Sequence, residues 1–369
     1  MKIVICLPTY NERENIERVI TAIFEQQCYL NGDEINTLVI DDNSPDGTAD
    51  IVRSLQTDFD KLHLITGRKE GLEAAYIRGF HFARTKLKAD IVLEMDADLS
   101  HDPADIPRMI EPLTDDADFV IGSRYVQGGS VPDNWGVFRR LNSRFGNIFA
   151  RFVAGLWKVK DCTTGFRSMK GSLIDKIDLS DLGVKGYAFQ IALLERAIRA
   201  GAVIREIPVD FTDRQLGTTK ISLTDILEFM VNCLWIRMGQ LKTFLRFCLV
   251  GTSGVVVNLG SFSLLYNFLG LNKFLASPIA IEISILSNFF LNNSWTFGGR
   301  NRDDALSVRG LKFNLVSLLS LGVSYGTFVL IMKNVPDMIP QLAQAIGIIP
   351  ATLVNYFMNA YWTFRERKV

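Results

Sequence analysis

Histidine is scarce in this chain of 369 residues, which contains only His63, His81 and His101. So few imidazoles argue against a histidine-based zinc site and against a catalytic triad that depends on histidine. The five cysteines are scattered without the spacing of a metal site, a pattern typical of reduced or buried thiols. Chemistry built on these two residue types is therefore not expected.

An excess of charge is also missing, because 40 basic and 40 acidic side chains give a formal net charge of zero. Nucleic-acid-binding proteins are expected to show a basic face, so no nucleic acid is expected as a partner. The chain also lacks a Gly-x-x-x-x-Gly-Lys-Ser/Thr loop, and no Gly-x-Gly-x-x-Gly follows the first predicted strand. These absences argue against a P-loop enzyme and a Rossmann dehydrogenase.

The first half of the chain has the pattern of an α/β domain. Short apolar runs at 3–7, 36–40, 62–66 and 91–95 alternate with segments of helical spacing. Strands that alternate with helices predict βαβ units and a mostly parallel, Rossmann-like sheet.

The run at 91–95 leads directly into Asp96-Ala97-Asp98. Residues i and i+2 share a face in extended chain, so the two carboxylates are expected to converge just past the strand. Open α/β sheets place their ligands at this edge, and carboxylate oxygens suit Mg²⁺ or Mn²⁺. An Asp-x-Asp alone leaves open a second interpretation, a plain turn rich in aspartate.

Two further polar loops are expected at the same edge, one with Tyr10 and Glu12 and one with Asp41 and Asp42. A nucleoside diphosphate would fit there. Asp42 can accept hydrogen bonds from base N–H groups, Tyr10 offers a ring for stacking, and a metal held by the carboxylates would neutralise the phosphates.

Long apolar stretches appear only in the second half, near 246–269, 274–297, 312–332 and 339–363. Each is about the 20 residues needed to cross a bilayer, which predicts an integral, multi-pass membrane protein. The segment 224–241 before them is amphipathic and suits a membrane interface. The stretches also repeat, because 288–297 aligns with 355–364, so two tandem helical hairpins are expected.

Basic residues predict the orientation of these stretches. They gather before the first stretch, between the second and third, and after the fourth. The positive-inside rule then places the catalytic domain and both termini in the cytosol. Glu282 lies inside the second stretch, and two interpretations stay open: a functional carboxylate, or a partner for an asparagine of a neighbouring helix.

Several motifs occur together and in a recognisable order. They are Leu7-Pro-Thr-Tyr-Asn-Glu12, Ile40-Asp-Asp-Asn-Ser-Pro-Asp-Gly-Thr48, Met95-Asp-Ala-Asp-Leu-Ser-His101, Gly122-Ser-Arg-Tyr125 and Arg214-x-x-Gly-x-x-Lys220. As a set they resemble the dolichyl-phosphate mannose synthases, inverting family-two glycosyltransferases of GT-A fold. The apolar half resembles the GtrA-like four-helix membrane domain. The expected division is a catalytic domain at 1–222, an interface helix at 223–243 and a transmembrane domain at 244–369.

The resemblance implies roles for particular residues. The base and ribose would be held by Pro8, Tyr10, Glu12, Ile40 and Asp42. The diphosphate and metal would be held by Asp96, Ala97 and Asp98, with Ser100 as a further metal ligand. The acceptor phosphate would face Arg124, Arg139 and Ser143, and Arg214 and Lys220 would close over the donor. Two departures from the family pattern are Thr219, where a serine is usual, and Gly71-Leu72-Glu73-Ala74, where Gly-Leu-Gly is usual.

The resemblance predicts transfer of mannose from GDP-mannose to a polyisoprenyl (dolichyl) phosphate, with inversion, at the cytosolic membrane face. Two alternatives stay open: a polyprenyl-phosphate glucosyltransferase that uses UDP-glucose, and a flippase for lipid-linked sugars. A processive polysaccharide synthase is disfavoured because the chain lacks a Gln-x-x-Arg-Trp motif.

Overall fold

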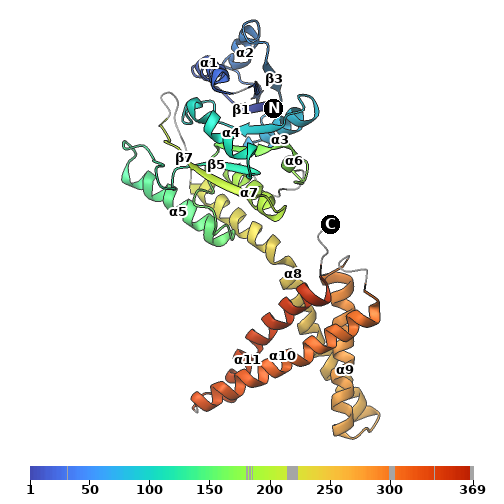
Figure 1. Ribbon diagram of the computed structural model, residues 1–369. Helices are drawn as coiled ribbons and strands as arrows, with labels where there is room; N and C mark the ends of the chain where they lie inside the picture. The colour runs from blue at the N-terminus through green and yellow to red at the C-terminus, as the bar shows by residue number, and fades with distance from the viewer. Residues whose placement is uncertain are drawn as a thin grey trace. The chain divides into compact units, whose positions relative to one another are not determined.

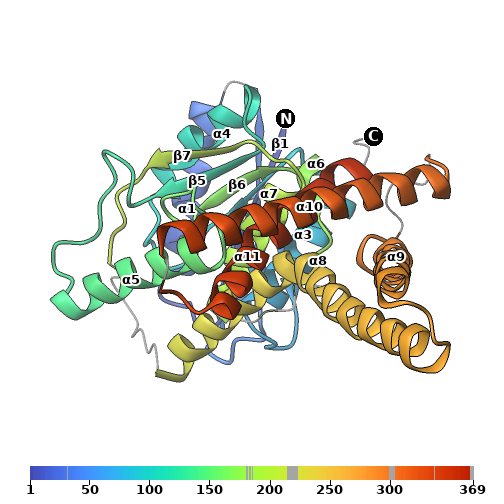
Figure 2. The same cartoon turned by 90° about the horizontal axis from the view of Figure 1, so that it is seen from below.

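A seven-stranded sheet is the centre of the first of the chain's two units, Met1–Arg237 (Figure 1). The computed structural model describes residues 1–30, 32–179, 182, 184, 186–213, 223–298, 304–335 and 337–365. The described strands are β1 (Lys2–Thr9), β2 (Glu34–Asp41), β3 (Leu62–Thr66), β4 (Ile91–Glu94), β5 (Phe119–Ser123), β6 (Arg167–Lys170) and β7 (Ile204–Pro208). Their order is β3-β2-β1-β4-β6-β5-β7, and Figure 2 shows β6, β5 and β7 side by side.

The sheet is mostly parallel, as the sequence predicts. Only β6 runs antiparallel to its neighbours β4 and β5. The sequence pattern did not indicate this strand, because Arg167 and Ser168 are polar yet fully buried. The last described strand, β7, pairs in parallel with β5. Hydrogen bonding continues past Pro208, because the Val209 N–H donates to the Ser123 carbonyl at 3.2 Å.

Helices cover both faces of this sheet. One face carries α1 (Ile16–Glu25), α2 (Thr48–Leu55) and α4 (Ile106–Thr114). The other carries α3 (Leu72–Thr85), α5 (Val137–Val153), α6 (Gly171–Ile174), α7 (Phe189–Arg199) and the start of α8 (Leu223–Ser263). Short 3₁₀ turns complete the described elements: η1 (Gln26–Tyr29), η2 (Pro103–Asp105) and η3 (Gly186–Ala188).

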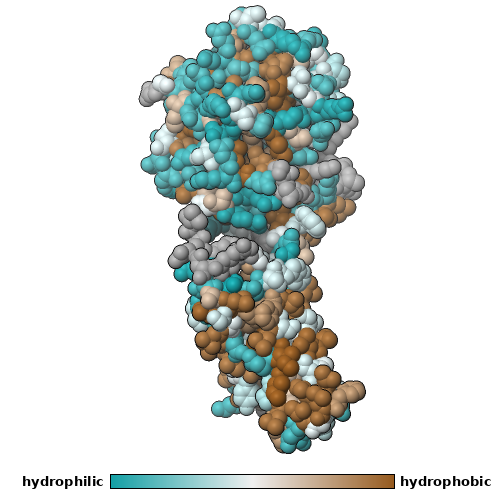
Figure 3. All heavy atoms as spheres, turned by 90° about the vertical axis from the view of Figure 1, so that its right-hand side faces the viewer, coloured by the Kyte–Doolittle hydropathy of each residue, from teal (hydrophilic) through white to brown (hydrophobic). Residues whose placement is uncertain are grey.

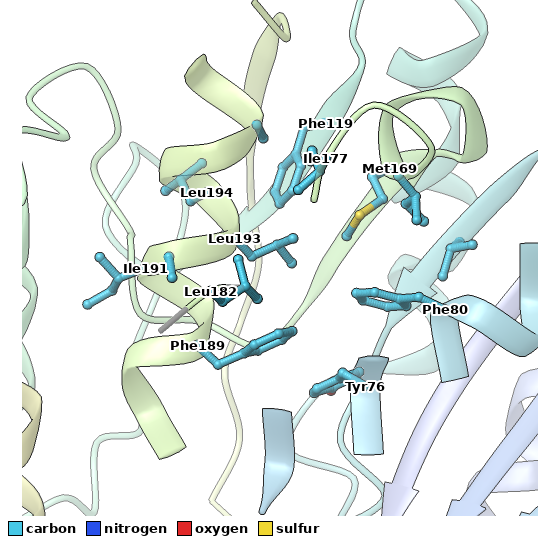
Figure 4. Close-up of a cluster of buried hydrophobic side chains, with 14 of the residues drawn as sticks. Tyr76, Phe80, Phe119, Met169, Ile177, Leu182, Phe189, Ile191, Leu193 and Leu194 are labelled. Carbon is cyan, nitrogen blue, oxygen red and sulfur yellow. The ribbon is translucent and has the colours of Figure 1, made fainter. Parts of the chain in front are cut away.

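The helices form because their apolar residues recur with helical spacing. In α4, Ile106, Met109, Ile110 and Leu113 occupy one buried face. On the opposite side of the sheet, α3 and α7 meet through aromatic rings (Figure 4). The Tyr76 and Phe189 rings stack with centroids 5.6 Å apart. Full burial of such a side chain contributes about 1.5–3 kcal/mol to stability.

The second unit, Met238–Val369, is helical where it is described. It contains the end of α8, then α9 (Lys273–Leu291), α10 (Leu306–Asn334) and α11 (Pro340–Met358). Three described segments are long and apolar enough to cross a membrane: Leu241–Phe268, Lys273–Thr296 and Leu306–Asn334. The last apolar stretch forms α11 but is not among these three, so four spans stay a prediction. Figure 3 shows apolar side chains over much of this unit's visible surface.

The repeat in the sequence is also a repeat of local structure. Helices α9 and α11 each continue into a π-helical segment, η5 (Asn292–Thr296) and η6 (Asn359–Thr363). After these segments, Phe297 stacks on its repeat equivalent Phe364 with centroids 4.7 Å apart. Another π-helical segment, η4 (Leu264–Phe268), ends α8.

Glu282 has a partner of the kind considered above. Asn314 of α10 donates a 2.7 Å hydrogen bond from Nδ2 to the Glu282 carboxylate on α9. The pairing with an asparagine of a neighbouring helix is therefore present.

Candidate active site

The predicted metal ligands lie in a tight turn after the central strand β4. The strand ends at Glu94, so Asp96, Asp98 and Ser100 come from the turn and not from extended chain. Leu99 has a left-handed φ of 61°, and the Ser100 N–H donates to Asp98 Oδ1 at 3.0 Å. The expected strand-like alternation of the two carboxylates is thus replaced by a hydrogen-bonded turn.

The side chains of this turn that were predicted to bind a metal all have oxygen as the ligating atom. They are Asp96, Asp98 and Ser100. Oxygen is the ligand that Mg²⁺ and Mn²⁺ prefer. Ala97 between the carboxylates belongs to the buried core, so a ligand could meet only its backbone. Within the described ranges, no three His, Cys, Asp or Glu side chains gather as a metal cluster. The donor set fits a hard cation whose other ligands come from a diphosphate or from water.

His101 closes the same turn, a contact that the sequence analysis missed. Its Nδ1 accepts a 3.2 Å hydrogen bond from the Asp96 N–H, and its ring stacks on Phe166 with centroids 5.0 Å apart. Burial lowers the pKa of His101, which keeps the ring neutral near pH 7 and leaves its proton on Nε2. The signal was a histidine at the end of the Asp-rich motif.

Arg124 follows β5 and is already paired. Its Nε and Nη2 donate to the two carboxylate oxygens of Asp161, each at 2.8 Å, and Nη2 also donates to Thr163 Oγ1 at 2.8 Å. Burial opposes the charge of Asp161, but the adjacent Arg124 prevails and holds the pKa of that carboxyl below its usual range. The sequence analysis did not indicate this pair.

Arg139 and Ser143 lie four residues apart on α5, and therefore on one face of the helix. The Arg139 guanidinium lies 4.1 Å from the centre of the Trp135 ring and forms a 3.0 Å ion pair with Asp213. The Ser143 hydroxyl and the Tyr125 hydroxyl are 2.7 Å apart and share a hydrogen bond.

These residues surround one cavity of about 270 Å³ in the first unit. Its polar part is lined by Asp96, Ser100, His101, Arg124, Arg139 and Ser143. Its apolar part is lined by Phe145, Phe149, Ile226, Phe229 and Met230, from α5 and the beginning of α8. The structure thus brings Asp96 and Ser100 together with the residues expected at the acceptor, whereas Asp98 is buried and does not line the cavity. It adds a hydrophobic wall that the sequence analysis did not predict.

The residues expected at the base and ribose lie at the ends of the neighbouring strands β1 and β2. Pro8 pairs with Ile40 in the parallel register, and the Asp42 N–H donates to the Thr9 carbonyl at 3.0 Å. Hydrogen bonds tie the two following loops together, including one from the Glu12 N–H to Thr48 Oγ1 at 3.1 Å. Since β4 is the next strand after β1, all three loops leave the same edge of the sheet.

Two basic side chains modify this part of the site. The Lys69 ammonium lies 3.5 Å from the centre of the Tyr10 ring and covers one of its faces. Arg78 of α3 donates from Nη2 to the Asp42 carboxylate. Burial raises the pKa of Asp42 even though Arg78 acts in the opposite direction. Neither contact was predicted, because both basic residues lie far from the recognised motifs.

A buried polar group lies directly beneath the metal turn. Gln190 of α7 donates from Nε2 to Glu94 Oε2 at 2.6 Å, and burial raises the pKa of the Glu94 carboxyl to about 7. Arg167 faces Glu94 across the β4–β6 pair and donates to three backbone carbonyls. The available signal in the sequence was a glutamate inside an apolar strand.

The two donor-loop residues, Arg214 and Lys220, lie outside the described residues.

Known families match both halves of the chain. Residues 4–178 match the model of glycosyl transferase family 2, and residues 246–364 match the GtrA/DPMS transmembrane domain. Among solved structures, glucosyl-3-phosphoglycerate synthase from Mycobacterium tuberculosis, in complex with Mn²⁺, UDP and glucosyl-3-phosphoglycerate, is 19% identical and has a TM-score of 0.47. It covers 64% of this chain and 79% of that one, and a likeness of this size says nothing about the substrate.

Three curated relatives are more similar. Dolichol-phosphate mannosyltransferase of Pyrococcus furiosus is 32% identical over 369 residues, 99% of each chain. Polyprenol monophosphomannose synthase of Mycolicibacterium smegmatis is 40% identical over 61% of this chain and 83% of that protein. Undecaprenyl-phosphate mannosyltransferase of Micrococcus luteus is 36% identical over 63% and 92%. The motif resemblance is thus confirmed, and the chain belongs to the family of dolichol- and polyprenol-phosphate mannosyltransferases, membrane proteins that are family-2 glycosyltransferases.

Proposed function

We propose that this enzyme transfers mannose from GDP-mannose to the phosphate of a polyisoprenyl (dolichyl) phosphate, with inversion at the sugar carbon. The observation that carries the proposal is the cavity, which has Arg139 and Ser143 in its polar part and Phe145 and Phe229 on its apolar wall. A polyisoprenyl phosphate has the same division into an anionic head and a hydrocarbon chain. The names of the curated relatives support the same acceptor class and the same sugar.

In this mechanism an oxygen of the acceptor phosphate attacks C1 of mannose. The bond between C1 and the β-phosphate oxygen breaks, and GDP leaves with that electron pair. A phosphate monoester is already anionic near neutral pH, since its second pKa is about 6, so no strong general base is required. Arg139 exchanges its partner Asp213 for the acceptor phosphate, and Ser143 donates a further hydrogen bond. Arg124, held by Asp161, contributes positive charge to the same cavity.

A divalent cation, Mg²⁺ or Mn²⁺, belongs to this proposal. Asp96, Asp98 and Ser100 would hold it, and when bound it would neutralise charge on the leaving diphosphate. Tyr10, Asp42 and the strand-end backbone at Pro8 and Ile40 would hold the nucleoside, with Glu12 beside them. Arg214 and Lys220 would close over the donor.

The first unit carries an apolar surface suited to lipid. Helix α5 exposes large apolar side chains at helical spacing, and so does α8 within this unit. They are Val137, Phe138, Leu141, Phe145, Ile148 and Phe152 on α5, and Leu227, Val231, Leu234 and Trp235 on α8. Arginines 139, 140 and 144 lie among the apolar residues of α5, an arrangement that suits a surface of anionic lipid headgroups.

This surface supports a division into a catalytic domain at 1–222, an interface helix at 223–243 and a membrane domain at 244–369. The distribution of basic residues supports a cytosolic catalytic domain and cytosolic termini.

A second candidate function, flipping of a lipid-linked sugar, is favoured by one observation. The helical unit contains a cavity of about 630 Å³ whose lining includes Ser317, Ser320, Ser324, Thr352 and Asn288. Polar groups are costly inside a membrane and mark functional sites there. This candidate is tested in proteoliposomes, by measuring how fast a fluorescent polyprenyl-phosphate sugar crosses the bilayer. The wild type is compared with Ser320→Leu, which changes a residue that lines the cavity.

The proposed transfer is tested with a donor panel. Purified protein, Mn²⁺ and polyprenyl phosphate are incubated with GDP-mannose, UDP-glucose and GDP-glucose, and the lipid product is identified by mass. We expect mannose transfer from GDP-mannose alone. Equal or faster transfer from UDP-glucose would overturn the proposed donor.

A further inference from the structure

Arg78 presents unused hydrogen-bond donors beside the predicted base site. The Arg78 side chain is 28% exposed and that of Asp42 is 9% exposed. Within the described structure, Nε and Nη1 of Arg78 are buried and have no hydrogen-bond partner. Buried donors without partners are costly, so a ligand that brings an acceptor to this side chain would gain from pairing with it.

The chain leaves room for this guanidinium at one particular position. A Cβ atom on Gly67, just after β3, would lie 2.8 Å from both Cζ and Nε of Arg78. A glycine therefore lets the guanidinium lie directly against the backbone at the end of β3. The neighbouring Asp41 does not compete for it, because its carboxylate accepts hydrogen bonds from Thr9 and Ser44.

The donor–acceptor order of this pair matches one nucleobase. The Watson–Crick edge of guanine presents an acceptor, O6, followed by two donors, N1–H and the N2 amino group. An arginine beside a carboxylate presents a donor followed by two acceptors. We propose that Arg78 and Asp42 together read this edge, with Arg78 donating to O6 and Asp42 accepting from N1–H and N2; the assignment rests on the proposed GDP-sugar donor.

The same pair disfavours the other common bases. Uracil presents O4, N3–H and O2, so its O2 would face an oxygen of Asp42 without a proton between them. Adenine presents a donor where Arg78 also presents donors. A site with fixed buried groups rejects such mismatches because the groups are left unpaired. Arg78 is thus a specificity-determining residue, and the choice of GDP-sugars over UDP-sugars follows from this pair.

Calorimetry with nucleotide analogues tests the assignment on the full-length protein in detergent. GDP is compared with 6-thio-GDP, which replaces O6 by a weak acceptor, and with IDP, which lacks the N2 amino group. We expect Arg78→Met to weaken GDP binding about ten- to a hundredfold, the worth of one hydrogen bond to a charged group. In that variant the difference between GDP and 6-thio-GDP should disappear while the difference between GDP and IDP stays.

Asp42→Asn should give the reverse pattern, with the difference between GDP and IDP lost. Gly67→Ala should copy Arg78→Met, because the new methyl group displaces the guanidinium without touching Asp42. Arg78→Lys keeps the charge beside Asp42 but loses the planar fork, so it guards against simple destabilisation. Arg53→Met, at an exposed arginine of α2, is the matched control and should leave every affinity unchanged.

Two results would overturn the inference, and they differ. If both Arg78 variants keep the full preference for GDP over 6-thio-GDP, Arg78 does not contact O6, although the donor can still be a GDP-sugar. If the unmodified protein binds UDP as tightly as GDP, the proposed donor is wrong. The proposal that Arg78 and Asp42 recognise guanine is then wrong as well.

Discussion

At the scale of single residues, the site is a set of side chains held by specific partners. Asp98 caps the Ser100 N–H, Arg124 is clamped by Asp161, and Arg139 lies between Trp135 and Asp213. Such partners fix the position of each charge before any ligand binds, which reduces the entropy lost on binding.

Asp98 combines a turn-forming and a proposed metal-binding role, and two substitutions separate them. Asp98→Asn keeps an oxygen for the Ser100 N–H but removes the charge, so we expect an unchanged melting temperature with Mn²⁺ affinity and transfer strongly reduced. Asp98→Ala should lower both the melting temperature and the Mn²⁺ affinity. Calorimetric Mn²⁺ titration and thermal melts measure the two effects. Asp102→Asn, at a similar turn bond to Ala104, is the control, and wild-type turnover of Asp98→Asn at limiting Mn²⁺ would disprove the metal role.

Arg139 is expected to act on the acceptor and not on the donor. Arg139→Ala should raise the apparent requirement for polyprenyl phosphate by about one to two orders of magnitude, the worth of one charge-assisted hydrogen bond. GDP-mannose affinity should barely change, and Arg139→Lys should recover only part of the loss. Initial rates at varied lipid concentration measure the lipid requirement, and calorimetry measures donor affinity. Arg53→Ala, at an exposed arginine of α2, is the control. A collapse of donor binding with an unchanged lipid requirement would place Arg139 in the donor site instead.

Glu94 should make stability depend on pH. Its folded pKa of about 7 exceeds its usual 4.5, so the protonated form stabilises the fold fully below about pH 4.5. This contribution, at most about 3 kcal/mol, is lost as the pH rises through 7. Glu94→Gln keeps the Gln190 contact but does not titrate. The melting temperature of this variant, relative to that of the wild type, should therefore rise between about pH 5 and pH 8. Glu111→Gln, at an exposed glutamate, is the control, and its melting temperature should differ from that of the wild type by the same amount across this range. The same constant difference for Glu94→Gln would contradict the prediction.

At the scale of elements, the helical unit is organised by its repeat. Equivalent asparagines in the two repeats each donate a side-chain hydrogen bond to the carbonyl four residues earlier. Asn292 donates to the Asn288 carbonyl, and Asn359 donates to the Asn355 carbonyl. The π-helical segments then deliver Phe297 and Phe364 to a shared aromatic cluster with Phe247, Phe289 and Phe313. Aromatic packing between the two copies holds this unit together.

The stacked pair Phe297 and Phe364 should therefore dominate the stability of the helical unit. Phe364→Ala, at a side chain with 0% exposure, should cost about 3–5 kcal/mol, and Phe297→Ala should behave similarly. Because the rings are in contact, the double variant should cost less than the sum. Thermal unfolding in one fixed detergent measures this. Phe268→Ala, 80% exposed, is the control, and an equal effect of that control would refute the cluster's role.

At the scale of the whole molecule, the residues proposed for the donor and metal belong to the first unit, and the candidate membrane-spanning stretches belong to the second. All residues proposed for the donor and metal lie before residue 221, and the three apolar spans begin at Leu241. The predicted membrane protein is confirmed by the match to a transmembrane domain at 246–364.

A chain that ends at residue 243 should keep donor binding. It retains the whole first unit, Met1–Arg237, including its sheet and both cores. Detergent is needed because Leu227, Val231 and Trp235 stay exposed. Calorimetry should give a GDP affinity close to that of the full chain. A monodisperse, folded truncation that binds no GDP would show that the membrane unit contributes to the donor site.

The sequence by itself determined the features that depend on local pattern. Helical and strand spacing predicted the mostly parallel sheet, apolar length predicted the membrane stretches, and motif order predicted the residues at the sheet edge. These signals are readable because they arise from neighbours within one element. Where the local pattern is ambiguous, the sequence did not decide the structure. The buried polar strand β6 was not predicted, and two interpretations stayed open for the turn that holds Asp98.

Tertiary structure alone decided the partners. Arg124 meets Asp161, Arg78 meets Asp42 and Gln190 meets Glu94 across 36 to 96 positions in the chain. No local pattern encodes such pairs, because they depend on strand order and on which helices cover which face. Burial then sets their strength, since removal of water makes an unpaired charge costly and a matched pair selective. The sequence therefore predicted where the chemistry occurs, and the fold decided which side chains lie together there.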